Sequence, residues 1–519
     1  PAPPPPAPPK AEPPKPPPPA AEPVFDPEAD AERKFVEGEL ANVGAVGLVP
    51  WENRVGLRLG VERVGEQFYA AFTPTVNHTR ELFDSKLSMS FGVPLRVEVF
   101  DARTDVRFDN AGRFRSEDWD DPRDYAQVIR AITFGGKEER RYIDINAFKA
   151  SSIGHGTVMK RYNPHLDLNR PRVGMQLDGF SDIGGVELFL NDITGPDVLG
   201  SLIFLKPLSL IDRDNYVLRS FSIGGVLVTD IDAPLRNHVD VNDVDDDGRR
   251  ETELVVDQDN FAPVYESTIV VAYGTSVEIK LIDTPTLDWK TYGDWSFLES
   301  GVPLDQTTFV GGEISTRAVR SEGAAWGHLF RINLGDELVH ALRIRLEYRN
   351  HAPNYLPSYF DALYEVQRVR YGSGQEASPD DLANGTKLQQ VLGRDPDGAR
   401  VHGGYFETSW RVGDYFAMAF GLSANDSTPD DTLFVHLEVP YLAGWQFLAT
   451  FQRTAADGAD DLFAGSIGDN DVFIGKTRYN VFDWFALSLE ALTPFGVGPE
   501  SVLRRTVQVN LAAELGFAY

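Results

Sequence analysis

The end of the chain alternates between apolar and polar or small residues, and this period of two constrains the fold most strongly. From residue 507 the sequence reads VQVNLAAELGFAY, and every second residue is apolar, from Val507 to Phe517 and Tyr519. Side chains of a β-strand point alternately to opposite faces, so the segment predicts a strand with one apolar face. Such a face has to be covered by lipid or by a second sheet.

The same alternation recurs along the chain, with full charges on the polar face. It is clearest in residues 54–62, 93–99, 277–281 and 342–349. A charged face requires water or ion-pair partners, whereas the apolar face requires lipid or another sheet. The charged positions are Arg58, Glu62, Arg96, Glu98, Glu278, Lys280, Arg343, Arg345, Glu347 and Arg349.

Composition excludes several classes of partner and site. The 519 residues carry 49 Lys+Arg against 78 Asp+Glu, a formal net charge of −29, which disfavours nucleic acid and anionic headgroups as general partners. The chain has no cysteine, which excludes disulfides, thiolate metal sites and cysteine nucleophiles. No run of about 18 apolar residues occurs, so the sequence offers no transmembrane helix.

The N-terminal region differs from the rest of the chain. Residues 1–25 are proline-rich, with 14 of the 35 prolines in the first 23 positions, and predict an extended polyproline II tail. The tail is either a stiff spacer or a docking peptide, through residues 1–23, for a periplasmic or envelope protein. No signal peptide is visible, so we expect the chain to be already processed. Residues 26–42 predict a short helix and linker, with Asp26 as N-cap and Pro27 following.

Residues 43–519 predict about 16–20 strands, including 54–64, 215–230, 306–318, 459–478 and 502–519. Three long insertions interrupt them, at 102–132, 231–260 and 351–400. We expect short helices in the first and third, and these insertions either plug the interior or form an outer docking surface. The first helix would start at Asp121-Pro122 and place Tyr125, Val128, Ile129 and Ile132 on one face. The others would start near Pro357 and at Ser378.

The insertion 231–260 contains a candidate calcium site. Asp243, Asp245 and Asp247 are spaced two apart, Gly248 follows, and Glu251 occupies the ninth position. Alternate carboxylates converge when such a loop wraps, and hard oxygen ligands in this number suit Ca²⁺. The segment resembles the DxDxDG calcium loops of the FG-GAP and dockerin-like kind, but position twelve of an EF-hand loop would be Leu254 rather than Glu. A structural Ca²⁺ ion and a solvated acidic loop both remain open.

No catalytic motif stands out, and we expect the protein not to be an enzyme. The most enzyme-like cluster is Gly154-His155-Gly156-Thr157, with His165 and Asp167 nearby. Nine histidines produce such neighbours by chance, and we interpret the cluster as a structural turn.

The charged faces are the stronger functional signal. The positions we expect to line a lumen are Arg58, Arg96, Glu98, Arg343, Arg345, Glu347 and Arg349. In a water-filled pore, such charges set a transverse field and select solutes. Alternatively, they pair across strands and fill the interior.

The C-terminal strand resembles that of bacterial outer-membrane β-barrels, a porin-like superfamily. The resemblance rests on the alternate apolar positions that end in Phe517 and Tyr519. It implies an all-β, transmembrane antiparallel barrel of about 16–20 strands in the outer membrane, with the tail in the periplasm. It also implies that these two residues form the signal read by the barrel-assembly machinery. A soluble propeller is the rival fold, but it would repeat the acidic loop at a fixed period, and the loop occurs once.

Two functions follow as hypotheses. The first is a porin-like channel or exporter with a charged lumen, embedded in outer-membrane lipid. The second is a structural anchor of an envelope-spanning complex that docks partners through the proline-rich tail and the long loops.

Overall fold

A computed structural model describes most of the chain from Asn53 onward. The described ranges are 53–64, 67–83, 85–101, 107–120, 124–136, 140–146, 150–164, 172–211, 215–242, 251–255, 263–301, 319–335, 340–371, 383–413, 415–465, 471–492, 495–497, 503–505 and 508–519. The predicted tail 1–25, the predicted helix and linker 26–42, and the predicted strand 306–318 lie outside these ranges.

Strands dominate the described residues. They are β1 (Arg54–Val64), β2 (Gln67–Leu82), β3 (Ser85–Gly92), β4 (Leu95–Asp101), β5 (Ile129–Phe134), β6 (Arg141–Asn146), β7 (Gly174–Ser181), β8 (Gly184–Leu190), β9 (Val198–Leu205), β10 (Ser222–Asn237), β11 (Val239–Asn242), β12 (Glu251–Leu254), β13 (Tyr265–Asp283), β14 (Leu287–Ser300), β15 (Arg320–Leu334), β16 (His340–His351), β17 (Val401–Val412), β18 (Phe416–Asn425), β19 (Asp431–Leu442), β20 (Trp445–Ala456), β21 (Asp471–Phe482), β22 (Phe485–Leu492), β23 (Phe495–Val497), β24 (Leu503–Arg505) and β25 (Gln508–Ala518).

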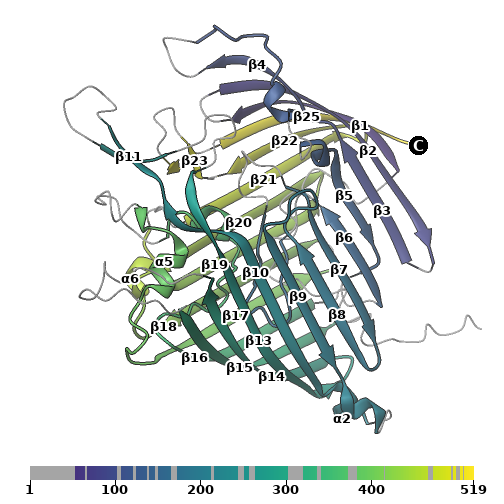
Figure 1. The fold of residues 1–519 in the computed structure, drawn as a ribbon. Helices are drawn as coiled ribbons and strands as arrows, with labels where there is room; N and C mark the ends of the chain where they lie inside the picture. The colour runs from purple at the N-terminus through teal and green to yellow at the C-terminus, as the bar shows by residue number, and fades with distance from the viewer. Residues whose placement is uncertain are drawn as a thin grey trace, which may run out of the picture.

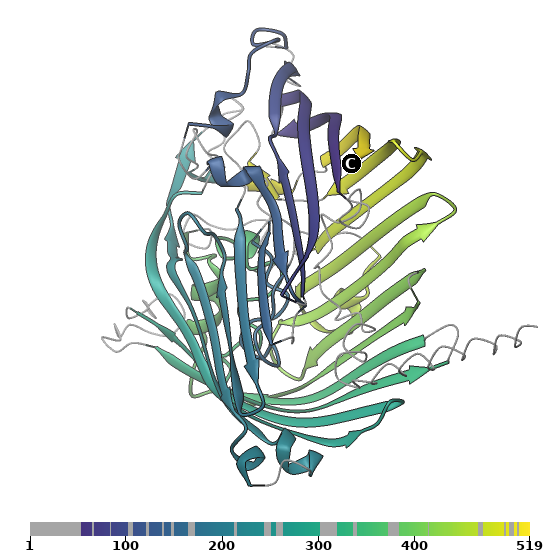
Figure 2. The same cartoon turned by 90° about the vertical axis from the view of Figure 1, so that its right-hand side faces the viewer.

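The main sheet closes into an antiparallel barrel (Figures 1 and 2). Successive strands pair with one another, and β1 also pairs with β25, from Arg54 opposite Ala518 to Val61 opposite Leu511. Strands β3 and β4 lie end to end along β2, on either side of Val93-Pro94. The 21 strands of this sheet therefore occupy twenty positions around the described barrel, which confirms the all-β barrel prediction at the upper end of its range.

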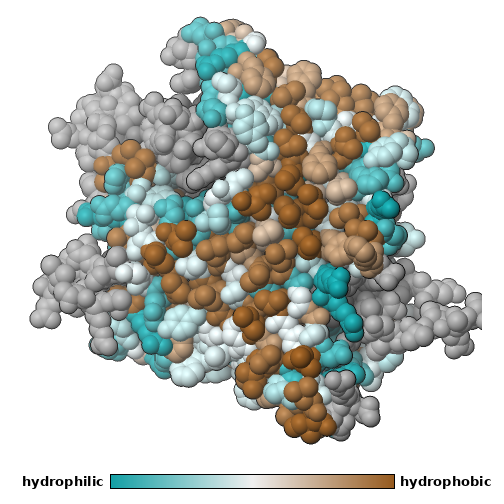
Figure 3. All heavy atoms as spheres, turned by 45° about the vertical axis from the view of Figure 1, so that its right-hand side comes forward, coloured by the Kyte–Doolittle hydropathy of each residue, from teal (hydrophilic) through white to brown (hydrophobic). Residues whose placement is uncertain are grey.

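The two faces of the barrel wall follow the alternation of the sequence. Figure 3 shows apolar side chains gathered across one side of the barrel. Because the described strands form a circuit that closes where β1 pairs with β25, this is the architecture of a transmembrane β-barrel. Exposed apolar strand residues include Val55, Val61, Phe72, Val76, Leu188, Ile203, Leu227, Ile269, Val277, Trp295, Trp326, Leu346, Val435, Leu487, Val509 and Leu511.

The two ends of the barrel carry different connections. At the end where β1 begins and β25 finishes, strands join through short turns such as 182–183, 284–286, 443–444 and 483–484. Ala443 and Gly444 both have positive φ, 51° and 87°, as two-residue hairpin turns require. With the exception of 206–221, connections longer than ten residues emerge at the other end. We call these the turn end and the loop end.

Aromatic side chains mark the turn end on the outer surface. Trp445 stacks against Tyr479 with 4.6 Å between ring centroids, beside the turn 443–444. Trp484 and Phe517 lie 6.3 Å apart at the next turn along the barrel. Such girdles are typical of the interface between membrane and water.

Helices are short and lie in the connections. None in the described part of the chain is long and apolar enough to cross a membrane. The helices are the 3₁₀ turns η2 (Ser116–Asp118), η3 (Asp124–Val128) and η4 (Pro207–Leu210), and the α-helices α2 (Tyr216–Ser220), α3 (Tyr364–Gln367), α5 (Lys387–Leu392) and α6 (Gly458–Leu462).

The predicted helix in insertion 102–132 is wrong beyond Val128. The chain forms η3 and then enters strand β5, so Ile129 and Ile132 belong to the barrel wall. Met89 of β3 lies opposite Ile132, and this pairing satisfies a β3 edge that would otherwise be exposed. Backbone pairing therefore outweighed the amphipathic pattern.

Three further boundaries differ from prediction. Residues 216–220 form α2 rather than the start of a strand, because the Asn215 side chain accepts hydrogen bonds from Val217 N and Leu218 N. Residues 458–462 form α6, and strand β21 begins only at Asp471. The insertion 231–260 is partly strand, since β10 continues to Asn237 and β11 pairs with β12.

Candidate functional site

Two loop-end connections fold back into the barrel and form a plug. We use this name for residues 150–164 and the described part of 352–394. Met159 and Phe360 form a parallel bridge, and Lys160 N donates to Phe360 O at 3.0 Å. Ser358 N donates to Thr157 O at 2.8 Å. Of the two placements that the sequence left open for the insertion 351–400, the described part of residues 352–394 is interior, whereas residues 395–400 are exposed.

The plug packs on an apolar patch of the barrel's inner wall. One buried cluster joins Tyr359 and Phe360 of the plug to wall residues of β9, β10, β13 and β14, among them Val228, Val270 and Leu298. These five side chains are at most 2% exposed. The wall makes room with small residues: a Cβ on Gly323 would lie 2.5 Å from Tyr355 Cε1. Shape complementarity of this kind indicates a packed interior rather than an open pore on this side.

Buried ion pairs secure the plug to the wall. Arg368 Nη1 lies 3.2 Å from Asp230 Oδ2 of β10, and Tyr364 Oη donates to the same oxygen at 2.7 Å. Within the interior, Arg172 Nη1 lies 2.5 Å from Glu365 Oε2. Burial alone would raise the pKa of Glu365, but Arg172 and Arg368 overcome it and lower this pKa to about 2. The carboxylate is therefore charged and paired at neutral pH.

A histidine ties the first plug segment to two strands. His155 lies in a turn between Gly154 and Gly156, whose φ values are +55° and +77°. Its Nδ1 is 2.9 Å from Asp294 Oδ1, and its Nε2 is 3.0 Å from Glu278 Oε2. Burial would lower the pKa of His155, but the two carboxylates raise it to about 10. His155 is thus a charged tether, and His165 and Asp167 lie outside the described residues.

One strand beyond the apolar patch, past β15, the wall carries a basic cluster on β16 and β17. Arg345 Nη2 and Arg349 Nε each lie 2.5 Å from the Glu347 carboxylate. Arg343 pairs with Glu407 of β17. Two plug residues reach the same carboxylate from inside the barrel: Lys160 Nζ lies 3.1 Å from Glu407 Oε2, and Arg161 Nη2 bonds that oxygen as well. We call these seven side chains the basic cluster.

The basic cluster has more cations than carboxylates. Within the described ranges, its five basic groups form ion pairs only with Glu347 and Glu407, so basic groups outnumber carboxylates by three. Aromatic rings compensate part of this excess, with Lys160 Nζ 3.6 Å from the centroid of Tyr405. Burial, followed by repulsion from Arg345, lowers the pKa of Lys160 well below its usual range.

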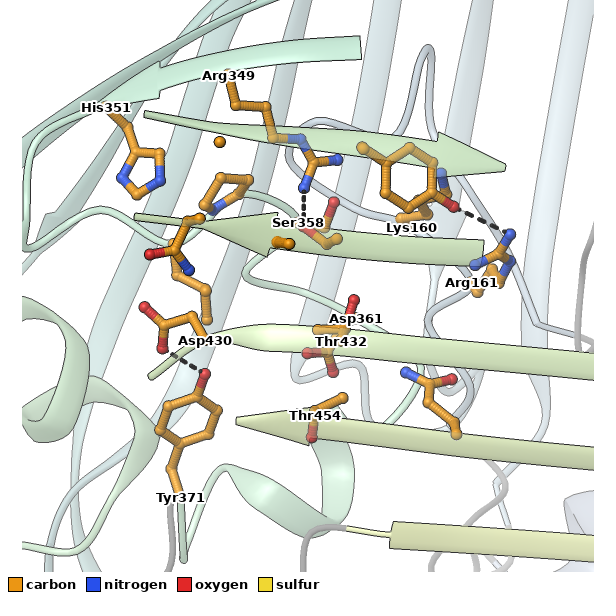
Figure 4. A pocket seen from close by; sticks show the side chains of 18 residues that line it. Lys160, Arg161, Arg349, His351, Ser358, Asp361, Tyr371, Asp430, Thr432 and Thr454 are labelled. Atoms are coloured by element: carbon orange, nitrogen blue, oxygen red, sulfur yellow. Dashed lines mark hydrogen bonds between the residues drawn. The ribbon is translucent and has the colours of Figure 1, made fainter. Parts of the chain in front are cut away.

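A cavity of about 60 Å³ opens beside the basic cluster, between the plug and strands β16 to β20 (Figure 4). Arg349 points into it; its Nη1 donates to Ser423 Oγ at 3.0 Å, and its buried Nη2 has no hydrogen-bond partner among the described residues. Gln452 Oε1, buried and likewise without a partner in the described ranges, is on another wall. The cavity therefore offers an unused cationic donor and an unused acceptor, with room for a few waters.

The acidic residues that line this cavity are already neutralised. Asp430 accepts from Arg394 Nη2 at 2.8 Å and from Tyr371 Oη at 2.9 Å. Asp361 lies 2.8 Å from Lys387 Nζ. The uncompensated charge facing the cavity is therefore positive, although the chain as a whole is strongly acidic.

The other predicted lumen charges pair more evenly. Arg96 binds Glu62 of β1 at 2.9 Å and Asp118 at 3.0 Å, and Glu98 is buried on the same face of β4. Arg58 Nη2 lies 3.8 Å from Glu490 Oε2. Of the two readings from the sequence, cross-strand pairing describes this side of the lumen, whereas Arg343, Arg345, Glu347 and Arg349 belong to the basic cluster.

The structure describes only some residues of the predicted calcium site and of the predicted barrel-assembly signal. Asp243, Asp245 and Asp247 lie outside the described residues, and Glu251 begins β12, so the calcium site stays a prediction. Phe517 faces outward on β25. Tyr519 Oη donates to Asn77 O at 3.1 Å, across β1 on strand β2. Their role in barrel assembly also stays a prediction.

Sequence reasoning missed Lys160, Arg161, Tyr405 and Glu407. The last two had a signal, because alternation in the predicted strand 402–412 puts Tyr405, Glu407 and Ser409 on one face. No sequence signal pointed to Lys160 and Arg161, because they lie in an irregular segment more than 240 residues away from Glu407.

Comparison with protein-family models and with curated proteins gave no match. Among solved structures, the chain is similar to Wzi, an outer-membrane protein involved in group 1 capsule assembly in Escherichia coli and a carbohydrate-binding β-barrel, at 10% identity and a TM-score of 0.29 over 90% of this chain and 85% of that chain. OccK11 (OpdR) of Pseudomonas aeruginosa is similar at 9% identity and a TM-score of 0.29 over 89% and 95%. The ferric enterobactin receptor PfeA of the same organism is similar at 8% identity and a TM-score of 0.25 over 90% and 81%. At these TM-scores the likenesses carry no functional argument.

Proposed function

We propose that this protein is an outer-membrane channel that passes small solutes and prefers anions. The observation that carries the proposal is the basic cluster, in which five cations share two carboxylates beside a cavity. The proposal includes no catalytic step.

The physical reason is the cost of unbalanced buried charge. Lys160, Arg161, Arg345 and Arg349 are each less than 10% exposed, so water screens them poorly. A mobile anion that enters the cavity supplies the missing countercharge and can hydrogen-bond to Arg349 Nη2. Rings of Arg and Lys select anions in pores for the same reason.

The narrow cavity favours small ions over large solutes. A volume of about 60 Å³ admits an ion with little of its hydration shell. The plug packs through its apolar core on the neighbouring wall of β9, β10, β13 and β14. The proposed route therefore runs along β16 to β20, and larger solutes would require the plug to move.

Reversal potentials in planar bilayers with a KCl gradient test this function. We expect steady conductance with anion preference for the wild-type protein. Arg349→Gln should lower the anion-to-cation permeability ratio by about fivefold, because one unit charge at about 4 Å in water is worth about 1 kcal/mol.

Arg478→Gln is the matched control, because Arg478 of β21 is a lumenal arginine that pairs with Glu514 at 2.8 Å and does not line the cavity. A similar loss in both variants would assign the preference to overall lumen charge. Cation preference in the wild-type protein would contradict the proposal.

A second candidate function, the structural anchor, is favoured by the plug's apolar core. Tyr162, Tyr364 and Phe360 are fully buried, as expected if the lumen never opens. A bilayer that stays sealed would support the anchor. Deleting residues 1–23 should then abolish pull-down of a periplasmic partner, whereas a simple pore should conduct unchanged after the deletion.

A further inference from the structure

The connection 206–221 is the long connection at the turn end, and it carries exposed apolar side chains. It runs from β9 to β10 through η4 and α2, and Figure 1 shows α2 beyond the ends of the strands. Leu210 is 68% exposed and Ile211 is 76% exposed. These values are unusual for large aliphatic residues in a turn that faces only water, so their surroundings need an explanation.

Helix α2 is held against the edge of β13. Strand β10 begins at Ser222, opposite Glu278, so β13 runs on beyond β10 to Asp283. Along this extension Ser220 Oγ accepts from Lys280 N at 2.9 Å, and Tyr216 Oη donates to Leu281 O at 3.0 Å. The connection is therefore docked on the barrel wall and does not hang free.

Strand register sets the height of α2 relative to the outer surface. Next to Leu281, Ile282 lies opposite Trp289 of β14, and Trp289 lies opposite Phe330 of β15. The rings of Trp289 and Phe330 stack 5.5 Å apart on the outward face. An outward Trp–Phe pair at the turn end is typical of the membrane interface, so the part of β13 that holds α2 lies level with that interface.

The apolar residues of the connection extend the lipid-facing surface. Ile203 and Leu205 on the outward face of β9 are both 61% exposed, and Leu210 and Ile211 follow them directly along the chain. We call these four residues the foot. The exposed Arg219 lies in the same connection, where a cation can meet lipid phosphates. Figure 3 shows an apolar protrusion at the bottom of the molecule, where Figure 1 places α2.

We propose that the foot inserts into the phospholipid interface at the turn end and fixes the depth of the barrel in the bilayer. The argument for lipid as the occupant is continuity: the foot continues the outward band of β9 at the height of an aromatic pair. Apolar side chains beside an exposed basic residue are a composition that binds at this interface. The inference depends on the transmembrane barrel and is independent of what passes through the lumen.

Single-cysteine spin labelling tests the foot cleanly, because the chain has no cysteine of its own. Leu210→Cys and Ile211→Cys carry a nitroxide in vesicles of phosphatidylethanolamine and phosphatidylglycerol. Accessibility to oxygen and to a water-soluble nickel complex is then compared. Leu227→Cys, on the outward face of β10, is the lipid reference, and Ala399→Cys, an exposed residue at the loop end, is the water reference.

We expect labels at 210 and 211 to favour oxygen over nickel, as at 227 and unlike at 399. Nickel accessibility equal to that at 399, in a variant that retains heat-modifiable migration on a gel, would overturn the proposal and leave a protein partner as the occupant. Loss of channel activity in the same preparations would bear on the proposed function alone, since the accessibility readout does not depend on conductance.

Discussion

Two regions of the inner wall differ in the side chains that they present to the barrel interior. On β9, β10, β13 and β14, inward residues such as Val228, Val270 and Leu298 are apolar and pack against the plug. On β16 and β17 they are charged and form the basic cluster. This difference shows that the lumen is not a uniform polar channel. Where the plug fills the lumen, the wall can be apolar on both faces, because one face meets lipid and the other meets the plug.

The largest effect should come from breaking the plug's buried ion pair. Arg368→Gln removes the cationic partner of the buried Asp230. Because the carboxylate then stays buried without that partner, the protein should be destabilised by about 3–5 kcal/mol. Arg400→Gln removes an exposed pair with Glu322 and should cost about 0–1 kcal/mol. Denaturant unfolding of both variants in detergent measures the difference.

Equal losses in these two variants would mean that the plug is not held by its buried pair. A larger loss for Arg368→Gln, together with raised conductance, would show that the plug closes the apolar side of the lumen.

An intermediate effect is expected at the histidine tether. Because its carboxylate partners raise the pKa of His155 to about 10, its stabilisation is complete below the ordinary histidine pKa of about 6.5 and is lost as pH rises through about 10. His155→Gln should cost about 1–3 kcal/mol at neutral pH, by leaving buried carboxylate oxygens poorly satisfied.

The same variant should remove the loss of stability that deprotonation of His155 causes at alkaline pH. Unfolding midpoints at neutral pH and above pH 10 should therefore differ less in His155→Gln than in the wild-type protein. An identical pH difference in both proteins would show that His155 does not hold its proton in the folded state.

The smallest effect should be a pH dependence of selectivity in the basic cluster. The pKa of Lys160 is lowered by burial and by Arg345, so falling pH adds a proton and a positive charge beside the cavity. Anion preference should therefore rise in the wild-type protein as pH falls below the ordinary titration range of lysine. Lys160→Met should flatten this rise.

Lys206→Met is the control, because Lys206 lies at the turn end and does not line the cavity. If both variants keep the wild-type pH profile, Lys160 does not titrate in this range. If both lose it, the effect arises from surface charge.

Much of the wall was predictable from the sequence because strand alternation is local. The strand 54–64 matches β1, and the alternation in 342–349 correctly placed Arg343, Arg345, Glu347 and Arg349 on the inner face. Local signals failed where two patterns competed. Ile129 and Ile132 fit a helix face, yet strand β3 needed a partner.

The apolar half of the interior was less readable from the sequence. In β9, VLGSLIFL is apolar on both faces, with Leu202 buried against the plug and Ile203 exposed. No periodicity distinguishes a lipid-facing residue from a plug-facing one, because both environments are apolar.

By itself, the sequence determined that the chain forms antiparallel strands with an apolar and a charged face, because that pattern depends only on neighbouring residues. Tertiary structure alone decided that two distant connections enter the barrel and that Lys160 and Arg161 join Glu407 of β17. These contacts join residues more than 240 positions apart. The charge balance of the lumen is therefore a property of the closed barrel, because only closure brings these side chains to one carboxylate.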